Sequence, residues 1–368
     1  MAKQHPANTR INHRYFDYLK QAHGRDEASI DVVARALAQF EQANGHKDFK
    51  AFHQRQVVAF KDKLAKQISK RTGQPLSRAT LHSTLTALRA FFLWLAGQPG
   101  YKSRLRYGDA DYFNLSDKEI RIAKADRFKT FPSLDQIHHV IGSMPTGTAI
   151  ELRNRALIAF TLLTGARDGA IASLKLKHVD LADGSAFQDA REVRTKASKT
   201  FKTWFFPVGG EAMAIVSDWC RYLRTELHWG DADPLFPPIQ VGIGENGGFA
   251  ATGLRRESWR GAGPIRKVFE TAFVAAGLPY FSPHSFRKTL VQLDERLCTT
   301  PEQFKAWSQN LGHDRVMTTL TSYGNVDPHR QAQLIRGFGA RMTAPAVDPA
   351  LVAQVVAAMQ NLPGNRLG

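Results

Sequence analysis

Hydrophobic side chains in the first hundred residues recur at every third or fourth position, which is the spacing of one face of an α-helix. The clearest run follows a candidate helix cap at Ser77 and consists of Leu81, Leu85, Leu88, Phe92 and Leu95. Residues 30–40 and 57–68 have the same spacing. Because the other faces of these segments carry many lysines and arginines, the pattern predicts a helical bundle with one basic side.

The positive charge of the chain is concentrated in this part. Of a formal net charge of +17, residues 1–130 contribute +12, from 24 Lys and Arg against 12 Asp and Glu. A chain this basic usually binds a polyanion, and nucleic acid is the first candidate. The predicted DNA-binding side chains are Lys61, Lys66, Lys70, Arg71, Arg78 and Arg89. For any single one of them, the simpler interpretation is a charge that only solvates its helix.

The chain of 368 residues is too long for one core of ordinary size, and two domains are expected. We predict a helical domain at 1–110, a linker at 111–131, a second domain at 132–340 and a tail at 341–368. The linker belongs to a stretch, 99–131, that contains Gly100, Gly108 and many charges. The second domain mixes helical patterns with strands around Val193 and in 204–208, and the Gly- and Pro-rich stretch 231–253 is expected to be a loop. The predicted fold class is mainly α with a small antiparallel β-sheet.

Several classes of protein are disfavoured. The N-terminus has no apolar stretch resembling a signal peptide, and the longest apolar run, 156–163, is too short to cross a bilayer. Cys220 and Cys298 form no CxxC motif, and we find neither a carboxylate cluster for Mg²⁺ nor a GxxxxGK[ST] loop. We therefore expect a cytoplasmic protein that needs no cofactor.

Five short segments of the second domain carry side chains suited to phosphate chemistry. They are Thr164-Gly165-Ala166-Arg167, Ser198-Lys199-Thr200, His284-Ser285-Phe286-Arg287, Leu311-Gly312-His313 and Tyr323. Each is a weak signal by itself, because a chain with this many histidines and arginines contains an HxxR pair by chance. Together they supply two arginines, two histidines and a lysine, which suit a phosphate whose negative charge grows as it reacts.

The local sequence around the HxxR pair strengthens this interpretation. Ser282 and Pro283 are typical of a helix cap and first helical position. His284 and Arg287 would then lie one turn apart on the same face, near the helix end that favours anions. The glycines that precede the other arginine and histidine predict backbone turns that aim those side chains into a site.

The order and spacing of the segments resemble the catalytic domain of the tyrosine site-specific recombinases, the family of phage-type integrases. That family has an Arg in TGxR, a Lys in a β-hairpin, HxxR, LGH and a Tyr. Its lysine lies eight residues before a proline, as Lys199 does before Pro207, which favours Lys199 over the neighbouring lysines. Its tyrosine follows the LGH histidine by nine or ten residues, and His313 to Tyr323 is ten. The resemblance covers residues 150–330 strongly and the N-terminal helices more loosely.

The resemblance implies a site-specific DNA recombinase that cleaves and rejoins DNA through a 3′-phosphotyrosyl link, without metal or ATP. The implied catalytic residues are Arg167, Lys199, His284, Arg287, His313 and Tyr323. The tyrosine is the nucleophile, the arginines and the second histidine bind the phosphate, the first histidine assists proton removal, and the lysine protonates the leaving oxygen. One position departs from the family, because the acidic residue usual three positions after the first arginine is Ala170 here. Asp168 would point elsewhere on a helix, which leaves that supporting role unassigned.

The implied partners are double-stranded DNA with inverted-repeat sites, a homo-tetramer on synapsed DNA, and accessory DNA-bending or directionality proteins. A nucleoid-associated protein encoded by a bacterium, a phage or another mobile element fits this description. The tail, with a helical pattern at 347–362, is expected to dock on the next protomer or on its own chain. Three alternatives stay open: a type IB topoisomerase, a non-catalytic DNA-binding relative and a telomere resolvase. The segment LGHDRVMTTLTSYGNV favours the recombinase.

Overall fold

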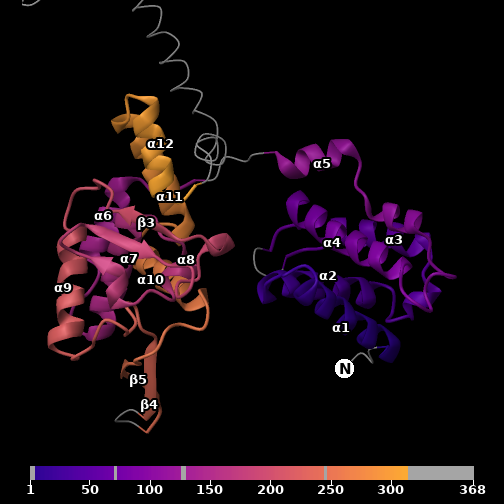
Figure 1. Cartoon of the computed structure of the whole chain (residues 1–368), viewed down its shortest axis with the longest axis horizontal. Coiled ribbons are helices and arrows are strands. Elements are labelled where there is room, and N and C mark those ends of the chain that lie inside the picture. Colours follow the sequence, from indigo (N-terminus) through magenta and orange to yellow (C-terminus); the bar gives the residue numbers. More distant parts are fainter. Residues whose placement is uncertain (1–4, 70–72, 126–129, 244–246, 314–368) are drawn as a thin grey trace, which may run out of the picture. The chain divides into compact units, whose positions relative to one another are not determined.

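The computed structural model describes residues 5–69, 73–125, 130–243 and 247–313 (Figure 1). The chain divides into two compact units, with the boundary between positions 126 and 127. Within the described ranges, no helix is both long and apolar enough to cross a membrane. The predicted fold class is confirmed, because helices dominate and the strands form small antiparallel sheets.

The first unit is built from helices and short 3-10 turns. Its elements are α1 (Pro6–Gln21), α2 (Glu27–Ala43), η1 (Phe49–Ala51), α3 (Gln54–Lys66), α4 (Arg78–Ala96), η2 (Tyr107–Phe113) and α5 (Asp117–Lys124). Ser77 caps α4 as expected, since its side chain accepts a hydrogen bond from the backbone N–H of Thr80. The hydrophobic face of α4 packs against α2, η2 and α5. Aromatic rings form the centre of this core, with Phe40, Phe92 and Phe113 in mutual contact.

The stretch predicted as a linker, 111–131, is partly ordered secondary structure. It contains all of α5 and the end of η2, where Phe113 is buried in the first core. A capping box at Ser116 and Glu119 starts α5. The division of the chain at 110 and 131 stays a prediction.

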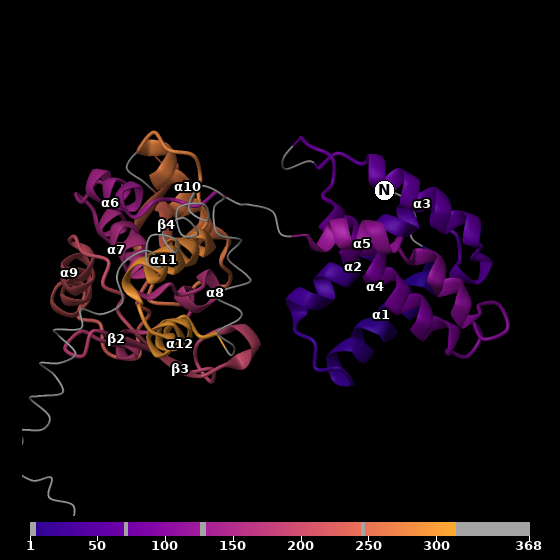
Figure 2. The ribbon, with the colours of Figure 1, turned by 90° about the horizontal axis from the view of Figure 1, so that it is seen from above.

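Seven helices of the second unit are described within residues 130–313. They are α6 (Leu134–Ser143), α7 (Ala149–Thr164), α8 (Asp168–Ile171), α9 (Ala212–Thr225), α10 (Gly263–Ala275), α11 (Pro283–Leu297) and α12 (Pro301–Asn310). Helix α7 is apolar on nearly every side and is buried between α9 and α11. In both views α7 lies at the centre of this unit (Figures 1 and 2).

A three-stranded antiparallel sheet lies beside these helices, in the order β1 (Val179–Asp180), β2 (Ser185–Gln188) and β3 (Phe201–Trp204). Gln188 pairs with Phe201, so the connection 189–200 is the hairpin loop between β2 and β3. The prediction of a strand around Val193 is wrong, because Val193 is a buried residue of this loop. The strand expected at 204–208 is also misplaced, since β3 ends at Trp204 and Pro207 cannot donate to a ladder.

The loop expected at 231–253 is partly wrong as well. This stretch contains β4 (Ile239–Ile243) and the start of β5 (Phe249–Leu254), which pair as an antiparallel hairpin that projects from its unit (Figure 1). The alternation of Ile239, Val241 and Ile243 is a strand pattern that the surrounding glycines obscured.

Candidate active site

The C-terminal end of α7 positions the first arginine. The helix ends at Gly165, whose φ of +58° is the left-handed conformation that glycine adopts without strain. A side chain here would also clash, because an added Cβ would lie 2.9 Å from Leu311 and 3.0 Å from Leu290. The chain then extends through Arg167, which is the N-cap residue of α8. The predicted turn before Arg167 is confirmed.

Helix α11 carries the HxxR pair. It begins at Pro283 after an extended Ser282, as expected, although the Ser282 side chain makes no capping hydrogen bond. His284 lies exposed in the first turn, while Arg287, one turn later, is only 2% exposed. The two side chains thus leave the same helix at different depths, one at the surface and one in the interior.

The guanidinium of Arg287 is held by three groups from two other segments. Its Nη1 donates to the carbonyl of Gly165 at 2.6 Å, and its Nη2 donates to the carbonyl of Leu311 at 2.5 Å. The same Nη2 lies 2.9 Å from Nε2 of His313. Because a guanidinium can only donate, Nε2 of His313 must accept, which places the proton of a neutral ring on Nδ1. Arg287 therefore joins the TGxR, HxxR and LGH segments.

A tight turn brings His313 to this point. Helix α12 ends at Asn310, and Gly312 follows with a φ of +69°. A Cβ at Gly312 would lie 2.6 Å from the ring of Phe201 in β3, so only glycine fits between α12 and the sheet. Figure 2 shows α12 beside β3. The predicted break before His313 is confirmed.

The pKa of His313 depends on the charges of other predicted site residues. Burial is the main cause that lowers the pKa of His313 to about 4, and the positive charge of Arg287 is the next. Arg167, Lys199 and His284 lower the pKa further by their charge. Four of the other predicted side chains therefore lie within electrostatic range of His313, and one of them, Arg287, contacts it directly. The resulting pocket of positive potential suits an anion.

Lys199 reaches this group from the β2–β3 loop. It lies two residues before β3 and follows two residues in the left-handed region, Ala197 with φ +57° and Ser198 with φ +51°. Lys202, by contrast, forms an ion pair with Asp183 at 2.5 Å and lies over the ring of Trp204. Of the lysines at 196, 199 and 202, Lys199 is the one whose charge acts on His313.

In the structure, too, position 170 offers no acidic side chain to the site. Ala170 is buried in α8 with no polar side chain to offer. Asp168 turns toward α10, where it binds Arg266 at 2.6 Å. Asp168 therefore does not take over the role at position 170. The supporting role stays unassigned.

Tyr323 and the helical pattern at 347–362 lie outside the described residues, as do Lys70 and Arg71 of the proposed DNA-binding set. Among the rest of that set, Lys61 donates to the carbonyls of Tyr112 and Asn114. Arg78 pairs with Glu119 at 3.6 Å, and Arg89 with Asp111 at 2.8 Å. Lys66 is exposed in the last turn of α3. The arginine pairs are at the surface, where a phosphate can replace the carboxylate.

Sequence reasoning missed a cavity of about 950 Å³ beside the site. It lies between β3 and α12 and is lined by Lys199 and His313 together with Phe201, Trp204, Trp307 and Asn310. Its walls come from segments a hundred residues apart, so no local pattern signals it. Nor does any local pattern indicate the polar contacts that hold the β2–β3 loop in place.

The comparisons with known proteins agree on one kind of protein. The chain is 26% identical over 254 residues to a protein named tyrosine recombinase XerC from Lactobacillus delbrueckii subsp. bulgaricus, covering 67% of this chain and 72% of the relative. A second XerC, from Halalkalibacterium halodurans, is 24% identical over 72% of this chain and 76% of its own length. No protein-family model matches the chain.

Solved structures share the fold. A lambda integrase dimer bound to a COC′ core site matches with a TM-score of 0.58 at 13% identity, covering 87% of this chain and 96% of that one. The XerH site-specific recombinase bound to palindromic difH substrate, in a post-cleavage complex, matches with a TM-score of 0.55 at 18% identity. That alignment covers 88% of this chain and 83% of XerH. The arrangement of helices and small sheets is therefore that of integrases and recombinases.

Proposed function

Because the chain belongs to the tyrosine recombinase family, we propose that it cleaves and rejoins DNA at specific sites through a 3′-phosphotyrosyl link. The observation that carries this proposal is the contact between Arg287 and His313, around which Arg167, Lys199 and His284 gather. A cationic group of this composition matches a phosphodiester that becomes more negative as it is attacked. Tyr323 is the proposed nucleophile.

In this proposal, Arg167 and Arg287 bind the non-bridging oxygens of the scissile phosphate. The guanidinium fork suits this task because it can present two N–H groups to two oxygens. The carbonyls that hold Arg287 fix its plane before DNA arrives, so little reorganisation is needed during the reaction. Since its pKa is about 4, His313 stays neutral near neutral pH and acts as a hydrogen-bond partner of the phosphate rather than as an acid.

The remaining groups move protons. His284 assists removal of the phenol proton of Tyr323 as its oxygen attacks phosphorus. Lys199 gives a proton to the 5′ oxygen as the phosphorus–oxygen bond breaks, which leaves a 5′ hydroxyl and a 3′-phosphotyrosine. The phosphodiester energy is kept in the covalent link, so the reverse attack by a 5′ hydroxyl rejoins a strand without ATP.

Double-stranded DNA is the proposed partner. A lambda integrase dimer on a core site and XerH on a palindromic substrate share this fold, and the chain has a net charge of +17. We infer a site with inverted repeats, bound by two copies, and a tetramer when two sites pair. Accessory DNA-bending proteins and docking of the tail on a neighbouring copy belong to the same proposal.

Trapping the covalent link tests this function. The protein is incubated with a library of duplexes that carry a nick close to each candidate cleavage point, so that a short fragment is lost and rejoining is blocked. We expect a protein–DNA adduct that survives SDS, and its DNA should contain inverted repeats. A plasmid pair bearing the recovered site should then exchange strands. Relaxation of supercoils without exchange would indicate a topoisomerase instead, and the lack of any adduct would refute cleavage.

A further inference from the structure

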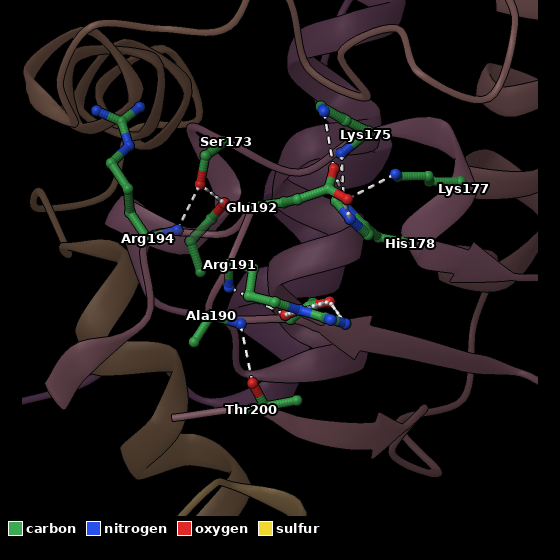
Figure 3. Close-up of polar contacts among 11 residues, drawn as sticks. Ser173, Lys175, Lys177, His178, Ala190, Arg191, Glu192, Arg194 and Thr200 are labelled. Atoms are coloured by element: carbon green, nitrogen blue, oxygen red, sulfur yellow. Dashed lines mark hydrogen bonds and ion pairs between the residues drawn. The ribbon is translucent and has the colours of Figure 1, made fainter. Parts of the chain in front are cut away.

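The β2–β3 loop carries Lys199 and is bound to the segment after α8 by ion pairs and hydrogen bonds (Figure 3). One is a carboxylate shared by two lysines. Glu192 accepts from Nζ of Lys175 at 2.8 Å and from Nζ of Lys177 at 2.7 Å. His178 lies 3.8 Å from the same carboxylate. The hydrogen bonds from Lys175 and Lys177 lower the pKa of Glu192 to about 2, so its carboxylate is charged at any pH near neutrality.

Hydrogen bonds of Arg194 also hold the loop in place. The N–H of Arg194 donates to Oγ of Ser173 at 2.8 Å. The guanidinium of Arg194 donates to the carbonyl of Arg260 at 2.7 Å and also reaches the carbonyl of Trp259. Between these ties, Val193 is buried in the core. The loop is therefore held from residue 192 to residue 194 by side-chain, backbone and hydrophobic contacts.

The two ends of the loop are also joined to each other. The N–H of Ala190 donates to Oγ1 of Thr200 at 3.0 Å, directly after Lys199 (Figure 3). The guanidinium of Arg191 donates to both carboxylate oxygens of Asp189. Lys199 lies between these contacts, directly after the left-handed Ala197 and Ser198.

The segment that binds the loop follows Arg167 closely in the chain. Ser173 lies six residues after Arg167, and α8 is all that separates them. We propose that Glu192 is a positioning residue, which holds the loop of Lys199 against the segment of Arg167 so that the lysine is placed over the leaving oxygen. This proposal rests on the proposed function, and in particular on Lys199 as the proton donor. Loosening the loop should then impair leaving-group protonation specifically.

A pair of DNA substrates separates this role from a general loss of structure. One substrate has the normal 5′ oxygen at the cleavage point, and the other has sulfur in its place, because a thiolate leaves without needing a proton. The whole chain is compared with Glu192→Gln, which keeps the shape of the side chain and removes its charge. Adduct formation is measured in single turnovers on both substrates.

For Glu192→Gln we expect a loss of roughly five-fold with the oxygen substrate, in line with two partly exposed ion pairs, and no more than about two-fold with the sulfur substrate. Lys199→Ala should show the same selective pattern with a larger loss. Glu211→Gln is the matched control, because it breaks an ion pair of similar kind, 3.3 Å long, between Glu211 at the start of α9 and Arg155 in α7. This variant should cleave both substrates as the unmodified chain does.

Equal losses on the two substrates, or no loss on either, would overturn the role of Glu192 while leaving the proposed function intact. A chain that forms no adduct with either substrate would overturn both. A Lys199→Ala variant that cleaves the oxygen substrate at the normal rate would overturn this inference and the assignment of Lys199 together. Thermal unfolding of each variant shows whether the fold is kept.

Discussion

Arg287 and His313 come from separate motifs and meet in the interior of the second unit at 2.9 Å. A buried guanidinium is costly unless its N–H groups are satisfied, and here two carbonyls and an imidazole nitrogen accept from three of its five N–H groups. The arrangement also decides the chemistry of His313, because a ring that accepts from an arginine cannot carry a second proton on that nitrogen. Position 313 therefore contributes a neutral hydrogen-bonding group.

The pKa of His313 leads to a prediction about stability and pH. Its value of about 4 in the folded chain lies below the usual 6.5 of an imidazole. Between these values the unfolded chain binds a proton that the folded chain does not, so the free energy of unfolding falls as the pH drops, by at most about 1.4 kcal/mol per pH unit. Above the usual pKa the histidine contributes no pH dependence, because both states are neutral.

We expect His313→Gln to have a shallower loss of stability than the unmodified chain when the pH is lowered from about 7 to about 5. Denaturant unfolding at several pH values measures this slope. His178, whose pKa is also lowered by burial, should keep part of the slope in the variant. Identical slopes for the two proteins would contradict the assignment of a neutral, buried His313.

At the scale of elements, the turn between α12 and the site depends on one glycine. Gly312 and Gly277 both have a positive φ, +69° and +72°. An alanine at Gly277 would meet open space, whereas one at Gly312 would press on the ring of Phe201. Both substitutions should cost about 1 kcal/mol for the backbone conformation. Gly312→Ala should cost a further ~1–3 kcal/mol for overpacking.

Gly312→Ala should also reduce adduct formation strongly, because it displaces either His313 or β3, while Gly277→Ala should leave it unchanged. Thermal unfolding and single-turnover cleavage of the two variants check this pair of expectations. Equal effects of the two alanines on both measurements would mean that the contact with Phe201 does not position the site.

Some of these elements could be predicted from sequence patterns and others could not. The cap at Ser77 and the glycine turns before Arg167 and His313 were predictable, because each rests on a few adjacent residues with a specific backbone requirement. The β4–β5 hairpin was not, since its many glycines read as a loop. The carbonyls that hold Arg287 carry no side-chain signature, so they could only be found in three dimensions.

At the scale of the whole molecule, the dominant property is charge. With a net charge of +17, binding to DNA should release many counterions. If the protein contacts about 6–10 phosphates, its affinity should fall by about 10³–10⁵ between roughly 50 and 200 mM salt. Fluorescence titrations of the full chain with labelled duplex at several salt concentrations measure this slope. An affinity that hardly changes with salt would contradict DNA binding through a basic surface.

The central claim is that Tyr323 becomes linked to DNA. The most direct measurement is protease digestion of the SDS-resistant adduct, followed by mass spectrometry of the peptide that carries the nucleotide remnant. The account predicts a phosphotyrosyl nucleotide at Tyr323 and no adduct from Tyr323→Phe. A remnant on any other residue, or an undiminished adduct from Tyr323→Phe, would contradict it.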